Sequence, residues 1–247
     1  MRILLTNDDG IDSPGLRRLQ GALGAAHEVW VVAPESNRSG SSHSITLGTP
    51  TRFRQVGERE YACGGTPADC VLVACLGLVP VKLDFVIAGV NLGPNLGTDI
   101  VYSGTAAAAR QGAFMGLPAI ACSLDSYGPP FHLEFPVEFV ARNLEAFGEV
   151  LSESHFLNVN FPNRKTPAGT AVTHPARRIY KDELVRFSPP QGDLYCFIGG
   201  GRPESVHEEG SDYWAIERGC VSLSPIVIHP ANHEVEERYR QAPFWGG

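Results

Sequence analysis

Short apolar runs alternate with helix-forming segments through the first two thirds of the chain. The apolar runs have the length of buried strands and are predicted at residues 2–6, 28–33, 84–89, 118–123 and 156–160. Helices are predicted between them, from Ser13-Pro14 onward and at residues 66–78, 106–115 and 136–151. This alternation predicts an α/β fold with a doubly wound, mostly parallel sheet.

Two regions depart from this alternation. Small antiparallel strands are predicted at residues 45–47, 51–55 and 59–63. Beyond residue 162, prolines interrupt short strand-like runs, of which residues 193–198 are the clearest, and a short helix (212–218) and a strand (220–224) precede the tail. We therefore expect a catalytic domain at residues 1–165. Residues 166–247 are expected to form a β-hairpin arm and tail, which would pack on another subunit or on the parent domain.

Composition and charge limit the classes of partner that the protein is expected to bind. The chain has 247 residues, of which 43% are hydrophobic and 19% charged, and a formal net charge of −7. A surface that binds nucleic-acid polymers needs clustered basic residues, so such a partner is not expected. No apolar stretch approaches the roughly 20 residues that span a bilayer, and the six scattered cysteines are typical of core thiols in a reducing compartment. We expect a cytoplasmic protein without a membrane partner.

Polar loops follow three of the predicted strands. Asp8 and Asp9 end the first strand, residues 34–44 follow the second, and residues 90–99 follow the third. The carboxyl ends of parallel strands meet at one edge of a sheet, where two adjacent carboxylates are costly without a cation. Hydroxyl and amide oxygens could complete a site for Mg²⁺, Mn²⁺ or Ca²⁺. The oxygen ligands expected at this edge are Asp8, Asp9, Ser39 and either Asn91 or Asn95.

A second candidate site lies at the start of the alanine-rich helix. Ser103, Gly104 and Thr105 offer free backbone N–H groups, two hydroxyls and the positive end of the helix dipole, so they predict an anion site. A divalent ion beside such an N–H cradle suits phosphoryl transfer. The G-x-S-x-G turn of serine hydrolases is absent from the sequence.

Motifs along nearly the whole chain resemble those of the SurE family of stationary-phase survival proteins, which are metal-dependent nucleotidases. The matching segments are LTNDDGIDSPG (5–15), APESNRSGS (33–41), GGTPAD (64–69), GVNLGPNLG (89–97), YSGTAAAAR (102–110), DYWAI (212–216) and GCVSLSP (219–225). The resemblance implies a Rossmann-like domain with a swapped C-terminal arm, a homodimer or homotetramer, and hydrolysis of nucleoside 5′- and often 3′-monophosphates.

The resemblance also implies a role for individual residues. One divalent ion per subunit, Mg²⁺ or Mn²⁺, would be bound by Asp8, Asp9, Ser39 and Asn91. Phosphate would contact Asn95, Ser103, Gly104 and Thr105. Our hypothesis is an in-line attack of water on phosphorus, in which Asp8 or Asp9 accepts a proton and Asn95 helps to stabilise the phosphoryl oxygens. Short polyphosphate is a further candidate substrate.

Two alternatives stay open. A non-catalytic nucleotide- or phosphate-binding regulator could use the same scaffold. A zinc-dependent deacetylase with a His-Pro-Asp-Asp motif is less compatible, because Asn7 stands where such a site needs histidine nearby. The sequence does not rank the bases, the 5′ and 3′ phosphates or the two metals.

Overall fold

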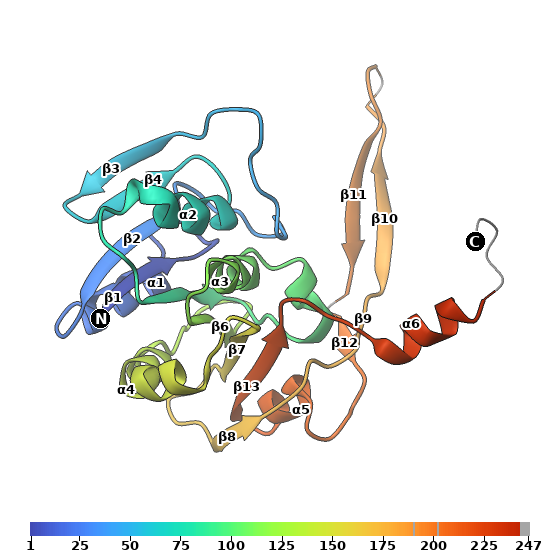
Figure 1. Ribbon diagram of the computed structural model, residues 1–247. Helices are drawn as coiled ribbons and strands as arrows, with labels where there is room; N and C mark the ends of the chain where they lie inside the picture. The colour runs from blue at the N-terminus through green and yellow to red at the C-terminus, as the bar shows by residue number, and fades with distance from the viewer. Residues whose placement is uncertain (190, 202, 243–247) are drawn as a thin grey trace.

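The computed structural model describes residues 1–189, 191–201 and 203–242, and a single large sheet organises this part of the chain (Figure 1). Nine strands pair in the order β3-β4-β2-β1-β5-β6-β7-β13-β8. Their bounds are β1 Arg2–Thr6, β2 Glu28–Pro34, β3 Phe53–Gly57, β4 Glu60–Cys63, β5 Phe85–Leu92, β6 Ala119–Asp125, β7 His155–Pro162, β8 Gly169–Val172 and β13 Cys220–Val227. All neighbours from β4 to β7 are parallel, which confirms the predicted doubly wound, mostly parallel sheet.

Helices cover both faces of the sheet. Helices α1 (Pro14–Leu23) and α4 (Glu134–Val150) contact each other on one face, and α2 (Pro67–Val73) and α3 (Gly104–Phe114) contact each other on the other. Each face has its own apolar core. Ile87 belongs to the core under α1 and α4, whereas the preceding residue Val86 belongs to the core under α2 and α3. The alternation of side chains along a strand explains why both faces of β5 are apolar from Phe85 to Ala88.

The strand order reverses between β1 and β5. From β1 the chain proceeds outward to β2 and β4, and it then returns to β5 on the other side of β1 before continuing to β6 and β7. The loops after β1 and β5 therefore diverge and leave a crevice, which is where open α/β sheets bind ligands. Asp8 and Asp9 follow β1, and Asn91 is the next-to-last residue of β5.

The sheet continues past residue 165. Strand β13 pairs antiparallel with β7, β8 pairs parallel with β13, and helix α5 (Asp212–Glu217) contacts β13. Part of the region beyond 165 thus completes the main sheet. The division into residues 1–165 and 166–247 stays a prediction, and positions 190, 202 and 243–247 of its second part lie outside the described residues.

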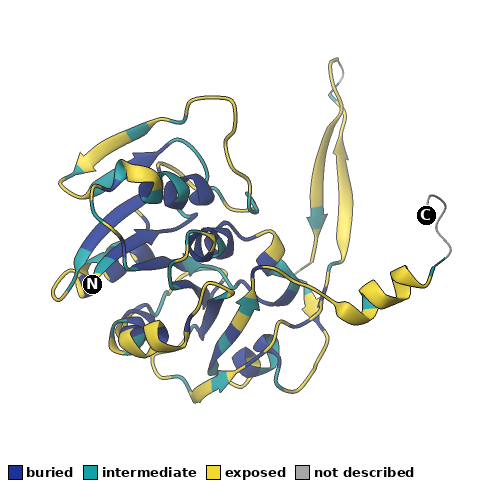
Figure 2. Ribbon diagram, viewed as in Figure 1, coloured by how far each residue is buried: buried dark blue, intermediate teal, exposed yellow. Residues whose placement is uncertain are grey.

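A long hairpin leaves the body of the molecule (Figure 1). Strands β10 (Asp182–Phe187) and β11 (Tyr195–Gly200) form it, and the short strands β9 (Arg178–Ile179) and β12 (Glu204–Ser205) pair at its base. Nearly all of the hairpin is exposed, including Phe187 and Phe197 (Figure 2). Helix α6 (His233–Arg240) follows β13 and is also exposed. No helix in the described ranges is both long and apolar enough to cross a membrane.

Three local predictions differ from the structure. Residues 45–47, predicted as a strand, form a loop, because the backbone and hydroxyl of Thr46 donate to Asp69 and not to a neighbouring strand. Strand β5 continues to Leu92 through a register shift, although a loop is predicted from residue 90. The helix predicted at 66–78 is α2 followed by a π-helical segment, η1 (Ala74–Leu78), in which Gly77 has a φ of 126°.

Candidate active site

The turn after β1 is built by Asn7. Its side-chain amide donates to the carbonyl of Gly10 (2.8 Å) and its Oδ1 accepts from the N–H of Gly10 (3.2 Å). Gly10 has a φ of 109°, and a Cβ there would lie 3.3 Å from the backbone of Ser36. The strand therefore ends in a tight turn that carries Asp8 and Asp9 next to each other, as the sequence predicts.

The carboxylate of Asp8 lies against the N-terminus of α3. Thr105 Oγ1 donates to Asp8 Oδ1 (2.5 Å), and a Cβ on Gly104 would lie 3.0 Å from Asp8 Oδ2. Burial raises the pKa of Asp8, and the Thr105 hydroxyl and backbone N–H groups of Thr105, Asp8 and Gly104 oppose that rise. The carboxylate of Asp8 is thus one anion at this helix N-terminus, and Thr105 and Gly104 orient it.

Asp9 is half-buried beside it. Its Oδ2 accepts from the N–H of Leu92 (3.0 Å), which ties the loop after β1 to the end of β5. Burial raises the pKa of Asp9, the Leu92 hydrogen bond lowers it, and the nearby charge of Asp8 raises it. Within the described ranges, the groups that lower the pKa values of these two carboxyls are hydrogen-bond donors, none of them a cation. This pair fits a divalent ion, whose charge would offset their burial.

Neutral oxygens in the same pocket come from the loop after β2 and from the end of β5. Ser39 is exposed in the loop after β2, and its N–H donates to Asn37 Oδ1 (2.9 Å). The Asn91 side chain donates through Nδ2 to Gly93 O (2.8 Å), which leaves its Oδ1 for a ligand. Among the residues the structure describes, no group of three His, Cys, Asp or Glu could hold a metal. A site here would therefore combine two carboxylates with hydroxyl and amide oxygens, as Mg²⁺ and Mn²⁺ accept.

Several of the predicted residues line one pocket of about 380 Å³. This is within the range of roughly 300–1,000 Å³ found for small-molecule sites. The predicted residues that line it are Asp8, Ser39, Asn91, Asn95 and Ser103. Asp9, Gly104 and Thr105 contact or support the Asp8 region but are not part of the lining. Ser103 caps α3, because its Oγ accepts from Ala106 N (3.0 Å).

Asn95 is held by a buried polar cluster that the sequence analysis did not identify. Its Nδ2 donates to Ser123 Oγ (2.7 Å) and its backbone N–H donates to Asn160 Oδ1 (2.9 Å). Its carbonyl accepts from Asn158 (2.8 Å) and Asn160 (3.0 Å). One N–H and the Oδ1 of the Asn95 amide stay available to a ligand. The alternating Asn158 and Asn160 within an apolar strand are the sequence signal for this cluster.

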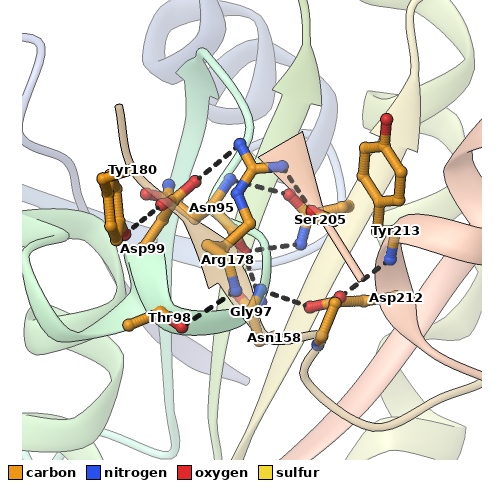
Figure 3. Close-up of polar contacts among 12 residues, drawn as sticks. Asn95, Gly97, Thr98, Asp99, Asn158, Arg178, Tyr180, Ser205, Asp212 and Tyr213 are labelled. Carbon is orange, nitrogen blue, oxygen red and sulfur yellow. Dashed lines mark hydrogen bonds and ion pairs between the residues drawn. The ribbon is translucent and has the colours of Figure 1, made fainter. Parts of the chain in front are cut away.

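The opposite wall of the pocket comes from the region beyond residue 165, which sequence reasoning left without site residues. Figure 3 shows the Arg178 guanidinium between Asp99 and Ser205, with Tyr180 beside Asp99. Arg178 pairs with Asp99 Oδ2 (3.1 Å) and donates to Ser205 Oγ (2.8 Å), and its side chain is only 2% exposed. Tyr180 donates to Asp99 Oδ1 (2.6 Å), and burial followed by the Asp99 contact raises the pKa of Tyr180.

Asp212 anchors this wall to the sheet. Its carboxylate accepts from the backbone N–H groups of Gly97 (2.7 Å), Ala176 (2.9 Å) and Tyr213 (2.8 Å) (Figure 3). Burial raises the pKa of Asp212, which these N–H groups and the charge of Arg178 oppose. One carboxylate thereby joins the loop after β5 to the segment before β9.

Comparison with known proteins identifies the family. The model of the family "Survival protein SurE" matches residues 3–182. The chain is 38% identical over 98% of its length to a 5′-nucleotidase SurE of Pelotomaculum thermopropionicum, 95% of which is covered, and 42% identical over 94% of its length to 5′-nucleotidase SurE 1 of Thermus thermophilus, 94% of which is covered. The crystal structure of the SurE protein from Aquifex aeolicus superposes with a TM-score of 0.84 at 35% identity, covering 98% of this chain and 100% of that one. The chain therefore belongs to the SurE family.

Proposed function

We propose that this protein is a divalent-metal-dependent nucleotidase that hydrolyses nucleoside 5′-monophosphates, with 3′-monophosphates and short polyphosphate as further substrates. The observation that carries the proposal is the pocket at the reversal of strand order, which gathers Asp8, Ser39, Asn91, Asn95 and Ser103 from separate loops. The names of the relatives, 5′-nucleotidase SurE, support the same activity.

The metal would be held by Asp8, Asp9, Ser39 and Asn91. The two partly or fully buried carboxylates supply negative charge without a cationic partner in the described ranges, and the other two residues supply neutral oxygens. One Mg²⁺ or Mn²⁺ ion bound there would act as a Lewis acid on the phosphoryl group.

The remaining roles in the reaction, phosphate binding and proton acceptance, fall to residues of the chain. Asn95 is fixed by its buried amide cluster and directs its remaining N–H toward phosphate, together with Ser103 at the start of α3. Gly104 and Thr105 hold Asp8 in place and, although they do not line the pocket, are proposed as further phosphate contacts beside Ser103. Water attacks phosphorus in line, and Asp8 or Asp9 accepts its proton.

The hairpin of β10 and β11 is proposed to join subunits into a homodimer or homotetramer. Its exposed apolar side chains, which include Phe187, Phe197 and Ile198, support this proposal because such a surface is normally covered by a partner. All six cysteines are free, which supports the proposed cytoplasmic location. We propose no nucleic-acid polymer or membrane partner.

The test is phosphate release from a panel of nucleoside monophosphates with Mg²⁺, Mn²⁺ or EDTA. We expect release with a metal and none with EDTA. Asp8→Asn should lower kcat/KM by at least about 100-fold, the size of effect that follows misplacement of a reacting group. Asp12→Asn is the matched control, because Asp12 lies four residues on and its side chain is 93% exposed.

Two results would contradict the proposal. Undiminished turnover in Asp8→Asn would show that Asp8 takes no part in the reaction. Tight nucleotide binding without phosphate release under any metal condition would instead favour a regulator that binds nucleotides without hydrolysing them.

A further inference from the structure

The connection between β2 and β3, called here the β2–β3 loop, is long and mostly exposed. It comprises residues 35–52, and Ser39, a proposed metal ligand, lies in its exposed first part. Exposed connections are usually more mobile than the elements they join. Beside Ser39, the N–H of Arg38 donates to Asp8 O (2.7 Å), which ties the loop to the turn after β1. The position of the Ser39 hydroxyl therefore depends on what else holds this loop.

Ser42 attaches the β2–β3 loop to the segment that precedes α3. Its N–H donates to Tyr102 O (3.0 Å), and its hydroxyl donates to Val101 O (2.7 Å). Val101 is the last residue of η2 (Gly97–Val101), and Tyr102 directly precedes Ser103, the cap of α3. One serine thus forms two hydrogen bonds across to the beginning of this helix.

The backbone of Ser42 is held in a left-handed conformation. Its φ is 53°, and among the non-glycine residues that the structure describes it alone has a positive φ. This conformation costs a residue with a side chain free energy, so it persists only where the surrounding contacts enforce it. The two hydrogen bonds of Ser42 supply such contacts. Strained residues of this kind are concentrated at functional sites, which directs attention to what the bend in the loop achieves.

His43 extends the attachment along α3. Its Nε2 is hydrogen-bonded to Oε1 of Gln111 (3.0 Å), a buried residue of the helix. Its ring stacks on Phe114, with centroids 5.7 Å apart and an interplanar angle of 28°. Both partners lie in the C-terminal half of α3, whereas Ser42 is attached just before its N-terminus. The loop therefore lies along the helix and cannot pivot about a single contact.

Helix α3 also orients Asp8, since Thr105 donates to its carboxylate. The helix is thus a common support for Asp8 and for the loop that carries Ser39. We infer that Ser42 and His43 are positioning residues for Ser39, which hold the β2–β3 loop on α3 and so keep the Ser39 hydroxyl in the pocket that Asp8 lines. The inference rests on the proposed function, because it takes Ser39 to be a ligand of the divalent ion.

The experiment measures Mn²⁺ binding by calorimetry, without nucleotide, in the wild type and in the double variant Ser42→Ala/His43→Ala. The dissociation constant should rise about 10-fold, because it increases in proportion as the fraction of molecules with a docked loop falls. In a Ser39→Ala background the same double substitution should change the constant less than about 2-fold, because no hydroxyl is left to position. Ser44→Ala is the matched control, since its hydroxyl donates to Ser41 O (2.8 Å) within the loop, and it should bind Mn²⁺ as the wild type does.

Trypsin cleavage after Arg38 gives a second readout that needs no metal. The double variant should be cleaved there about 10-fold faster than the wild type, because cleavage follows the population of the undocked loop. Ser44→Ala should be cleaved at the wild-type rate. An unchanged rate in the double variant would show that other contacts hold the loop, and it would overturn the inference.

The binding data separate this inference from the proposed activity. Wild-type Mn²⁺ affinity in the double variant, an equal loss in the Ser39→Ala background, or an equal loss in Ser44→Ala overturns the inference even when the wild type hydrolyses nucleotides. If the wild type binds Mn²⁺ but releases no phosphate, the proposed function fails, while the expected changes in affinity still support the positioning role. If the wild type binds no divalent ion, both are overturned.

Discussion

Replacing Gly104 by alanine should damage the site around Asp8 while leaving the rest of α3 folded. A Cβ at this position would lie 2.8 Å from Asp8 Cβ, 2.9 Å from Ser41 Oγ and 3.0 Å from Asp8 Oδ2. The residues Ala106 to Ala109 that follow are fully buried against the sheet, so the helix cannot retreat. Asp8 must therefore shift.

The magnitude follows from two opposing effects. Inserting a methyl group into a packed site costs about 1–3 kcal/mol, and the better helix propensity of alanine returns up to about 1 kcal/mol. We expect a loss of unfolding free energy of about 0–3 kcal/mol. Turnover should fall much more, by about 100-fold, because a displacement of roughly 1 Å at a reacting group has that effect.

Gly112→Ala on the same helix is the control. Its Cβ would lie 2.9 Å from Val86 Cβ and Cγ2 and 3.1 Å from Ala119 Cβ, so the crowding is similar but falls against β5 and β6. Urea unfolding and AMP turnover with a Mn²⁺ titration would be measured on both variants. We expect both to lose stability and only Gly104→Ala to lose turnover and metal response. Wild-type turnover in Gly104→Ala, or an equal loss in Gly112→Ala, would refute the reasoning.

Three further predictions concern other parts of the molecule. Ser123→Ala should lower kcat about 10-fold with a smaller change in KM, because the buried Asn95 amide loses its 2.7 Å acceptor; equal kcat in steady-state assays would contradict this. Burial raises the pKa of Asp69, but bonds from the backbone and hydroxyl groups of Thr46 and Thr66 hold it below its usual range. Asp69 therefore stabilises the fold above its ordinary pKa and loses that effect as the pH falls through its lowered pKa, so the stability difference from Asp69→Asn, about 1–3 kcal/mol at pH 7, should vanish in acid unfolding curves. Phe197→Ser on the exposed hairpin should reduce the molecular mass in size-exclusion chromatography without lowering the Tm of the subunit; an unchanged mass would count against the arm as an interface.

The end of the pocket proposed to bind a metal is predictable from the sequence because its signals are local. An apolar strand followed by Asp8, Asp9 and Gly10 shows where the strand stops, and each further polar loop follows a recognisable strand. Parallel strands bring their carboxyl ends to one edge, so Ser39 and Asn91 could be placed there without coordinates.

The N-terminus of α3 is a place where local sequence signals do not suffice to predict the structure. Ser103, Gly104 and Thr105 predict an anion site, and the structure shows that the carboxylate of Asp8 is one anion at this helix N-terminus, while phosphate contact there stays a prediction. The sequence cannot decide which anion comes closest, because that depends on how far α3 approaches the end of β1. The Gly104 approach to Asp8 is a property of that packing alone.

The pocket wall formed by Asp99, Arg178 and Tyr180 depends still more on tertiary structure. About 80 residues separate Asp99 from Arg178 and Tyr180, and these residues meet because Asp212 binds the loop after β5 and the segment before β9 together. No periodicity or spacing encodes such a contact.

The sequence by itself determined the parallel α/β sheet, its strand ends and the position of two adjacent carboxylates at one of those ends, since each follows from hydrophobic period and local chemistry. Tertiary structure decided that β8 and β13 extend the sheet, that Thr105 holds Asp8, and that Arg178 and Tyr180 complete the pocket. The physical reason is that these features are contacts between distant segments, fixed by buried hydrogen bonds and ion pairs that exist only after the sheet has assembled.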